Sequence, residues 1–259
     1  MTIDRPIPSQ RRKPMPSLKG YSSDLEYSYA PGVFPSLELM RVRPECATRL
    51  LLSERAQGEG VEKLRQVCRE HGVREEIADK ALRRISGKDN CFAAVVFEKW
   101  QAELLPDAPH VVLHHPMDEG NLGTIQRTLL GLGLKDIAVI RPAADAFDPH
   151  VVRATMGALF SLRLKQYDSF EAYRQEYPAH RLYPFMLDGS VMLEEAVGQV
   201  QKPYALVFGN EGSGLPPEFA EMGQAVRIPH SNEIDSLNLS IAVGIGAYAF
   251  VHAADKQEG

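Results

Sequence analysis

The sequence has few cysteines, and their arrangement excludes two classes of protein. The chain of 259 residues contains only Cys46, Cys68 and Cys91, which lie far apart and form no CxxC pair. A disulfide-rich secreted domain and a cysteine-ligated zinc cluster both need more cysteines at characteristic spacings. The set therefore favours a protein of the reducing cytoplasm.

Long apolar runs are also missing. No stretch reaches the length of about 20 apolar residues that spans a bilayer. The nearest approach, residues 239–254, is rich in alanine and glycine and contains Ser240 and His252. The first 24 residues are rich in proline and basic residues and lack the apolar centre of a signal peptide. We predict no membrane partner, and a flexible basic tail over residues 1–24.

Metal-binding patterns are absent as well. Histidines occur at positions that include His110, His114, His115 and His150, but no cysteine or carboxylate accompanies these four at the spacing of metal ligands. We therefore expect them at strand ends or in loops, and we predict that the protein needs no metal.

Acidic residues outnumber basic ones, yet the two signs are unevenly distributed. The net charge is −5, but residues 1–105 contain 18 Lys and Arg against 15 Asp and Glu, whereas residues 106–259 contain 11 against 19. An excess of positive charge in the first part permits contact with phosphates, although a solvated surface of mixed charge gives the same count. Composition therefore leaves nucleic-acid binding open.

Two regions of α/β pattern are separated by a linker. Within residues 25–103, helices are predicted over residues 32–42, 60–72 and 77–86, and strands over residues 48–54 and 90–100. The segment 101–110 contains Pro106 and Pro109 and is typical of a linker. From residue 108 to residue 259, strand and helix patterns alternate, with a helix predicted over residues 149–160, a strand over residues 181–187 and the last strand over residues 225–229. This alternation predicts a mainly parallel sheet with helices on both faces.

Three polar stretches follow predicted strands of this second region, where parallel α/β sheets bind their ligands. In the first stretch, Asn121 lies near a helix start and Arg127 follows six residues later. Arg127 has apolar neighbours, so its charge needs a partner. That partner is either a carboxylate in a structural ion pair or a bound phosphate or ribose.

The second stretch is the glycine-rich turn at residues 208–216. Its glycines have the order GxxGxG, not the GxGxxG of dinucleotide-binding turns, and the chain contains no GxxxxGK[ST]. Glycines let a ligand approach the backbone closely, but many such turns are only turns. Glu211, in the middle of the stretch, is either a solvated loop charge or a carboxylate that holds an arginine in place.

The third stretch precedes an apolar helix predicted over residues 236–254. We expect Ser236 to cap this helix and Asp235 to lie favourably at its positive end. Asn238 and Ser240 follow the expected cap, so capping does not explain them.

In order and spacing, the three stretches resemble the motifs of the SpoU/TrmH family of RNA 2′-O-ribose methyltransferases, part of the SPOUT superfamily. The first family motif, N-x-G-x-x-x-R, is matched by Asn121, Gly123 and Arg127. The second motif, G-x-E-G-x-G, is matched by residues 209–214. The third motif consists of I-P followed, after six residues, by S-L-N-[VL]-S, and it is matched by residues 228–240. The ordered set is highly specific and covers residues 121–240.

The resemblance implies an architecture. Residues 108–259 are expected to form an α/β methyltransferase domain with a parallel sheet and a C-terminal trefoil knot, a rare exception to the rule against threading. Residues 25–103 more weakly resemble the L30e-like domain that binds RNA substrates in this family. The implied cofactor is S-adenosylmethionine, and the implied assembly is a homodimer with active sites at the subunit interface.

The resemblance also implies roles for individual residues. The cofactor pocket is expected to include Phe208, Gly209, Gly214, Ile228, Leu237 and Asn238. The implied catalytic set is Asn121, Arg127, Glu211, Ser236 and Asn238. Arg127 is either the base or the organiser of the ribose hydroxyl, and we favour the organiser because a guanidinium is a poor base. Asn121 and Glu211 are expected to orient Arg127.

One departure and two alternatives accompany this prediction. The third motif often carries Met and Gly where this chain has His230 and Asn232, which alters the edge of the expected pocket. The expected reaction is methylation of a ribose 2′-hydroxyl, in rRNA rather than tRNA because of the small N-terminal domain. The alternatives are a non-catalytic RNA-binding or ribosome-assembly factor, which would not need all five polar residues, and a base-directed enzyme, which the N-x-G-x-x-x-R motif disfavours.

Overall fold

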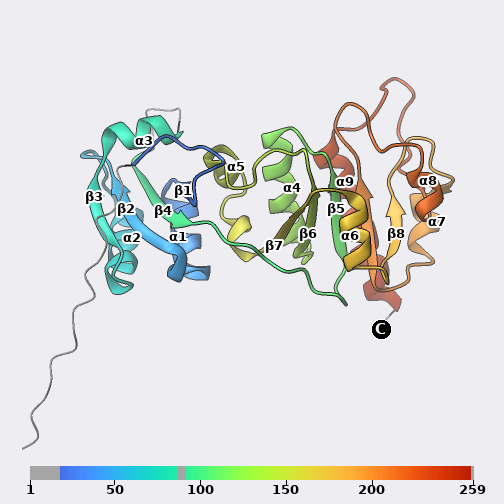
Figure 1. Cartoon of the computed structure of the whole chain (residues 1–259), viewed down its shortest axis with the longest axis horizontal. Coiled ribbons are helices and arrows are strands. Elements are labelled where there is room, and N and C mark those ends of the chain that lie inside the picture. Colours follow the sequence, from blue (N-terminus) through green and yellow to red (C-terminus); the bar gives the residue numbers. More distant parts are fainter. Residues whose placement is uncertain (1–17, 87–90, 258–259) are drawn as a thin grey trace, which may run out of the picture.

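A computed structural model of the chain describes residues 18–86 and 91–257 and contains two main sheets that lie side by side (Figure 1). The predicted tail over residues 1–24 lies largely outside the described residues. The N-terminal sheet has the strand order β1-β4-β2-β3. Its region contains β1 (Tyr27–Pro31), α1 (Val33–Val42), a 3-10 turn (Pro44–Cys46), β2 (Ala47–Leu52), α2 (Glu59–Glu70), β3 (Arg74–Ile77), α3 (Asp79–Ser86) and β4 (Ala93–Glu98).

The second sheet has the order β7-β6-β5-β10-β8, and every neighbouring pair is parallel. The predicted parallel α/β sheet is therefore confirmed. Its region contains β5 (His110–His114), α4 (Glu119–Gly131), β6 (Asp136–Ile140), α5 (Pro149–Ala154), a 3-10 turn (Ala158–Ser161), β7 (Arg163–Tyr167), α6 (Phe170–Glu176), β8 (Arg181–Pro184), β9 (Val191–Met192), α7 (Leu193–Val197), β10 (Tyr204–Phe208), α8 (Phe219–Met222), β11 (Val226–Arg227) and α9 (Leu239–Gln257).

Helices cover both faces of this sheet, because alternate side chains of each strand point to opposite faces. Val111 and Leu113 of β5 pack in one apolar cluster with residues of α4, α5, α7 and α9. Val112 lies between them and packs in another cluster, with residues of α6 and α8. The strands are thus apolar on both faces, as in parallel sheets generally.

The strand predicted at residues 225–229 does not join the main sheet. It is shortened to β11 and pairs with β9 in a separate two-stranded sheet. A single bridge between Phe185 and Val226 links β11 to the end of β8. The chain therefore leaves the main sheet after β10 and passes beside β8 before it enters α9.

Three local predictions were wrong. Strands β1 and β3 were missed; β3 is exposed throughout and has the sequence REEI, which carries no apolar alternation. The helix predicted over residues 149–160 is interrupted after α5, because Met156 and Gly157 adopt positive φ angles of 50° and 85°. A Cβ at Gly157 would also lie 2.5 Å from Cβ of Glu38, so only glycine fits there.

The two regions share a continuous apolar core. Phe97 of β4 packs edge-on against Phe160, with ring centroids 5.4 Å apart. Trp100 is the only tryptophan of the chain, and its ring packs against Phe147 with centroids 5.0 Å apart. The guanidinium of Arg43 lies 4.4 Å from the centroid of the Trp100 ring. The segment before β1 adds a hydrogen bond from the Tyr21 hydroxyl to Asp145. These contacts fix the two sheets relative to each other.

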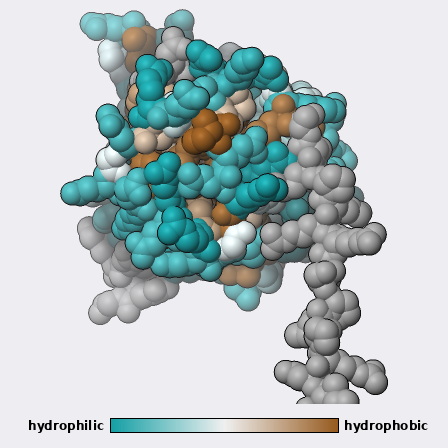
Figure 2. All heavy atoms as spheres, turned by 90° about the vertical axis from the view of Figure 1, so that its left-hand side faces the viewer, coloured by the Kyte–Doolittle hydropathy of each residue, from teal (hydrophilic) through white to brown (hydrophobic). Residues whose placement is uncertain are grey.

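The surface at the N-terminal end, around β3, α2 and α3, is mostly hydrophilic, with apolar residues gathered near its centre (Figure 2). Among the described residues, no helix combines the length and apolarity needed to cross a membrane.

Candidate functional site

The first polar stretch forms the loop from β5 into α4. Asp118 caps α4, and its carboxylate accepts a hydrogen bond from the backbone N–H of Asn121 at 2.7 Å. The side chain of Asn121 is consequently not used for capping. It remains available for contacts with the other two stretches.

The second stretch is a tight turn organised by Asn210. The backbone groups of Asn210 and Gly214 exchange two hydrogen bonds, of 3.1 and 3.0 Å. The amide oxygen of Asn210 accepts from the N–H groups of Gly212 and Ser213, and its amide nitrogen donates to the His115 carbonyl at 2.8 Å. A Cβ at Gly209 would lie 2.1 Å from the carbonyl carbon of Gly214, so the turn closes only with glycine at this position.

Glu211 links this turn to the first stretch. Its carboxylate accepts hydrogen bonds from the backbone N–H groups of Met117 and Asp118, both at 3.1 Å, and from the Asn121 amide at 3.3 Å. Burial raises the pKa of the Glu211 carboxyl, but these donors lower it more, so its pKa lies below the ordinary value. Glu211 is therefore not a solvated loop charge, and no arginine of residues 18–86 and 91–257 pairs with it.

The third stretch joins the same network through Asn238. Its amide donates to Oδ1 of Asn121 at 3.0 Å. Its amide oxygen accepts from the N–H and the hydroxyl of Ser240, at 2.9 and 2.7 Å, and more weakly from the N–H of Ile241. Asn238 is thus the cap of α9, which begins at Leu239. The expectation that Ser236 caps this helix was wrong, and the polar residues at positions 238 and 240 are explained by the cap and by Asn121.

Arg127 stands apart from this network. It lies on the exposed side of α4, and it makes no hydrogen bond or ion pair with any other residue that the structure describes. It lines a shallow groove together with Thr124, Thr128 and Leu132. Arg127 therefore forms no structural ion pair with a carboxylate of residues 18–86 and 91–257. Neither Asn121 nor Glu211 makes a hydrogen bond to its side chain.

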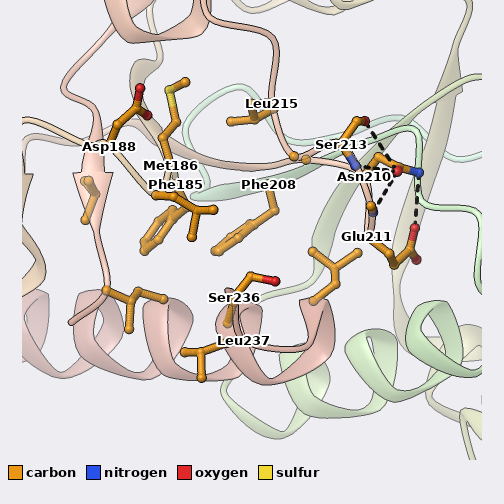
Figure 3. Close-up of a pocket in the computed structure, with 18 of the residues that line it drawn as sticks. Phe185, Met186, Asp188, Phe208, Asn210, Glu211, Ser213, Leu215, Ser236 and Leu237 are labelled. Atoms are coloured by element: carbon orange, nitrogen blue, oxygen red, sulfur yellow. Dashed lines mark hydrogen bonds between the residues drawn. The ribbon is translucent and has the colours of Figure 1, made fainter. Parts of the chain in front are cut away.

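A cavity of about 490 Å³ lies beside the network (Figure 3). Its walls come from residues 185–188, 208–215, 226, 228, 230, 236, 237, 239 and 242. Figure 3 shows Asn210, Glu211 and Ser213 gathered at one end and Asp188 at the other. The lining includes five of the six residues expected to bind the cofactor, namely Phe208, Gly209, Gly214, Ile228 and Leu237, and also the expected catalytic residues Glu211 and Ser236.

The remaining expected site residues are not part of this lining. Asn121 and Asn238 form the network at its edge, and Arg127 lies in the separate groove. Sequence reasoning missed the wall after β8, residues 185–188, because residues 181–187 were predicted as one strand, whereas β8 ends at Pro184. Only the sheet order shows that β8 is next to β10 and therefore ends at the same cavity.

The described residues contain no group of three or more histidine, cysteine, aspartate or glutamate side chains arranged to hold a metal ion. His114 is buried, and its ring lies tilted against the ring of His115, with ring centroids 3.8 Å apart. Burial and the neighbouring ring lower the pKa of His114.

Comparison with known proteins assigns this arrangement to a family. Residues 108–248 match the SpoU rRNA Methylase family. Because the match covers more than half of the chain, the protein belongs to this family.

Individual relatives agree with the assignment. An uncharacterized tRNA/rRNA methyltransferase from Synechocystis sp. is 30% identical over 53% of this chain, which spans only 51% of that relative. A 23S rRNA (guanosine-2′-O-)-methyltransferase from Acinetobacter baylyi is 26% identical over 86% of this chain and 95% of its own length. The crystal structure of an AdoMet-bound rRNA methyltransferase from Sinorhizobium meliloti superimposes with a TM-score of 0.76 at 27% identity, over 88% of this chain and 87% of that one.

Proposed function

We propose that this protein transfers a methyl group from S-adenosylmethionine to a ribose 2′-hydroxyl of RNA. The observation that carries the proposal is the hydrogen-bonded series Asn238–Asn121–Glu211, which joins all three family motifs at the edge of one cavity. A binding factor would not need these side chains to converge beside a cavity large enough for a cofactor.

The cavity fits S-adenosylmethionine in shape and polarity. Phe185 and Phe208 stack with centroids 4.3 Å apart and form an apolar wall suited to a flat base. Gly209, whose missing side chain lets two backbone segments meet, exposes backbone groups to the ligand. The negatively charged carboxylates of Asp188 and Glu211 attract the positively charged sulfonium. Gly214, Ile228 and Leu237 line the same cavity, so five of the six predicted cofactor contacts are placed together, and Asn238, the sixth, lies at the edge.

S-adenosylmethionine supplies a methyl group that its sulfonium already activates, so the protein has to align the reactants and assist proton loss. Arg127 keeps its charge and is free to bind the phosphate next to the target nucleotide and orient the 2′-hydroxyl. The proton then passes to phosphate or water. Asn121 and Glu211 act through the start of α4, which they fix, and thereby position Arg127 two turns later. Ser236 and Asn238 complete the edge of the site.

Ribosomal RNA is the favoured substrate. The Acinetobacter relative, named as a 23S rRNA methyltransferase, matches both regions of this chain. Within the N-terminal region, residues 25–103, the described residues form four strands and three helices. We assign this region the L30e-like role of binding RNA, in which shape and unstacked bases select the target. With an RNA substrate of this kind, we propose that the enzyme acts in the cytoplasm.

Residues 108–259 are proposed to contain the trefoil knot of the SPOUT superfamily. Support comes from the route of the chain after β10, since Gly189 packs on the backbone of Val226 and Gly223 packs on Leu182. Pulling the chain from residues 110 and 257 tests this. A knotted chain stays shorter than its contour length of about 3.3–3.6 Å per residue, whereas an unknotted chain reaches it.

The enzyme is proposed to act as a homodimer through α9. Ile241, Ile245 and Tyr248 are 53%, 38% and 54% exposed and recur at helical spacing, so they form one apolar stripe. α9 packs beside α4, which carries Arg127. A second copy on this stripe would therefore lie close to Arg127 and complete the site.

The deciding experiment is methyl transfer from labelled S-adenosylmethionine to ribosomal and transfer RNA from a strain that lacks the protein, followed by digestion to nucleosides. We expect label in a 2′-O-methyl nucleoside of ribosomal RNA. Label on a base would overturn the ribose assignment. Intact cofactor binding without any label would favour the RNA-binding or assembly factor.

A further inference from the structure

The polar side chains of the cavity fall into two groups. Asn210, Glu211 and Ser213 are hydrogen-bonded to one another or to neighbouring backbone, at one end of the cavity (Figure 3). Asp188, Ser236 and one ring nitrogen of His230 make no hydrogen bond with any residue that the structure describes. Each residue of the second group therefore has a polar atom without a hydrogen-bond partner among the described residues, and that atom is free to meet a ligand.

His230 is held in one orientation. Its Nδ1 lies 3.0 Å from the carbonyl oxygen of Ile228, two residues earlier. A carbonyl oxygen only accepts hydrogen bonds, so Nδ1 is the donor in this contact. In the neutral ring Nε2 then keeps its lone pair and is a hydrogen-bond acceptor on the cavity wall. The ring is half-buried, which restricts it further.

We infer that His230 accepts, at Nε2, a hydrogen bond from the 6-amino group of the adenine of S-adenosylmethionine, and so positions the cofactor. This inference rests on the proposed function. The neighbours of His230 in the wall, Val226, Ile228 and Leu237, are apolar and suit the face of a purine. The adenine base has one hydrogen-bond donor, its 6-amino group, because its free ring nitrogens are acceptors.

The position distinguishes this chain from the family pattern, which often has Met there. A thioether is a weak acceptor, and the long Met side chain is flexible. His230 replaces it with a fixed acceptor. The hydrogen bond of Nδ1 to the Ile228 carbonyl holds this acceptor in place.

Calorimetric titration with two uncharged ligands tests the inference. One is S-adenosylhomocysteine, and the other is its analogue with purine in place of adenine, which lacks the 6-amino group. We expect His230→Met to bind S-adenosylhomocysteine about 5- to 10-fold more weakly, as for loss of one ordinary hydrogen bond. The same variant should bind the purine analogue as wild type does, because the partner of Nε2 is already missing.

Two further variants complete the design. His230→Gln, which retains an acceptor near the position of Nε2, should recover part of the affinity. His71→Met is the matched control, because Nδ1 of His71 is likewise 3.0 Å from a backbone carbonyl but the residue is exposed just after the end of α2, away from the cavity. Unchanged thermal melting of each variant shows that it is folded.

The outcomes are distinct. A His230→Met variant that binds both ligands like wild type, or that loses the same factor for both, overturns the inference. Loss confined to S-adenosylhomocysteine supports it. A wild-type chain that binds neither ligand would overturn the proposed function and this inference together.

Discussion

Among the motif residues, Arg127 carries a charge that meets no partner in the part of the chain that the structure describes. The other motif side chains with contacts in the network, Asn121, Glu211 and Asn238, bind one another or the backbone. Arg127 is exposed and contributes nothing visible to the stability of the described chain. A residue of this kind can be replaced without loss of the fold, which makes it a clean probe of chemistry.

We expect Arg127→Ala to lower kcat by about 100-fold, because a misplaced nucleophile costs that much even when every other group is present. Affinity for S-adenosylhomocysteine should stay the same. Single-turnover methyl transfer and calorimetry measure the two quantities. Arg181→Ala, at the amino end of β8, is the control. Turnover that survives in Arg127→Ala would show that this residue has no catalytic role.

His110 is a second residue with a measurable consequence, although it lies far from the cavity. Its ring is buried, its nitrogens contact the Leu105 carbonyl at 2.8 Å and the Tyr173 hydroxyl at 3.0 Å, and it stacks on His180. Burial, and then the neighbouring His180, lower the pKa of His110 to about 4. The native state therefore holds this ring neutral.

A lowered pKa of a base makes stability fall as pH falls, because the unfolded chain takes up the proton first. The loss should begin near the ordinary histidine value of about 6.5 and be complete near 4, with a size of about 3 kcal/mol. Urea unfolding of wild type and His110→Gln at pH 7, 6 and 5 measures it. The variant should be less stable at pH 7, but its free energy of unfolding should depend less steeply on pH. Equal slopes in the two proteins would contradict the assignment of this pH dependence to His110.

At the scale of elements, the turn after β10 depends on a close crossing. Gly209→Ala would force its Cβ to within 2.1 Å of the Gly214 backbone, and backbone atoms do not move aside as side chains do. We expect a loss of about 1–3 kcal/mol in stability and at least a tenfold loss in cofactor affinity. Gly212→Ala is the matched control in the same turn, since its Cβ would meet only the Asn210 amide oxygen at 3.6 Å. Equal effects of the two variants would count against the role of this crossing.

The contact between the two sheets depends on Trp100. Trp100→Ala removes the packing on Phe147 and the cation contact with Arg43. We expect a loss on the order of 2 kcal/mol, below that of a fully buried tryptophan, because Trp100 is only half-buried. Denaturant unfolding followed by circular dichroism measures it, with Trp100→Phe as the control that keeps an aromatic ring. Unchanged stability in Trp100→Ala would mean that the sheets are held by other contacts.

At the scale of the whole molecule, the apolar stripe on α9 tests the proposed homodimer. Ile245→Asp should halve the mass measured by light scattering, because a buried, unpaired carboxylate is costly at an interface. Met222→Asp is the control, since Met222 has a similar exposure of 39% but lies on α8. A wild-type chain that is already monomeric would overturn the homodimer.

The sequence by itself determined the local pieces and the class of chemistry. Strand and helix periods predicted the parallel sheet, and the order of three short motifs identified the family that the comparisons show. Each strand or helix period, and each single motif, depends on residues close together in the chain. Such patterns follow from the pleat of a strand, the turn of a helix and the small size of glycine.

Tertiary structure decided which of those residues meet. Only the sheet order brings the end of β8 to the cavity, and only the fold makes Asn238 both the cap of α9 and the partner of Asn121. Sequence reasoning placed Glu211 beside Arg127, but the carboxylate instead binds the backbone of residues 117 and 118. The physical reason is that a half-buried carboxylate binds whichever donors the packed backbone brings to it, and that choice depends on contacts about 90 residues apart in the chain.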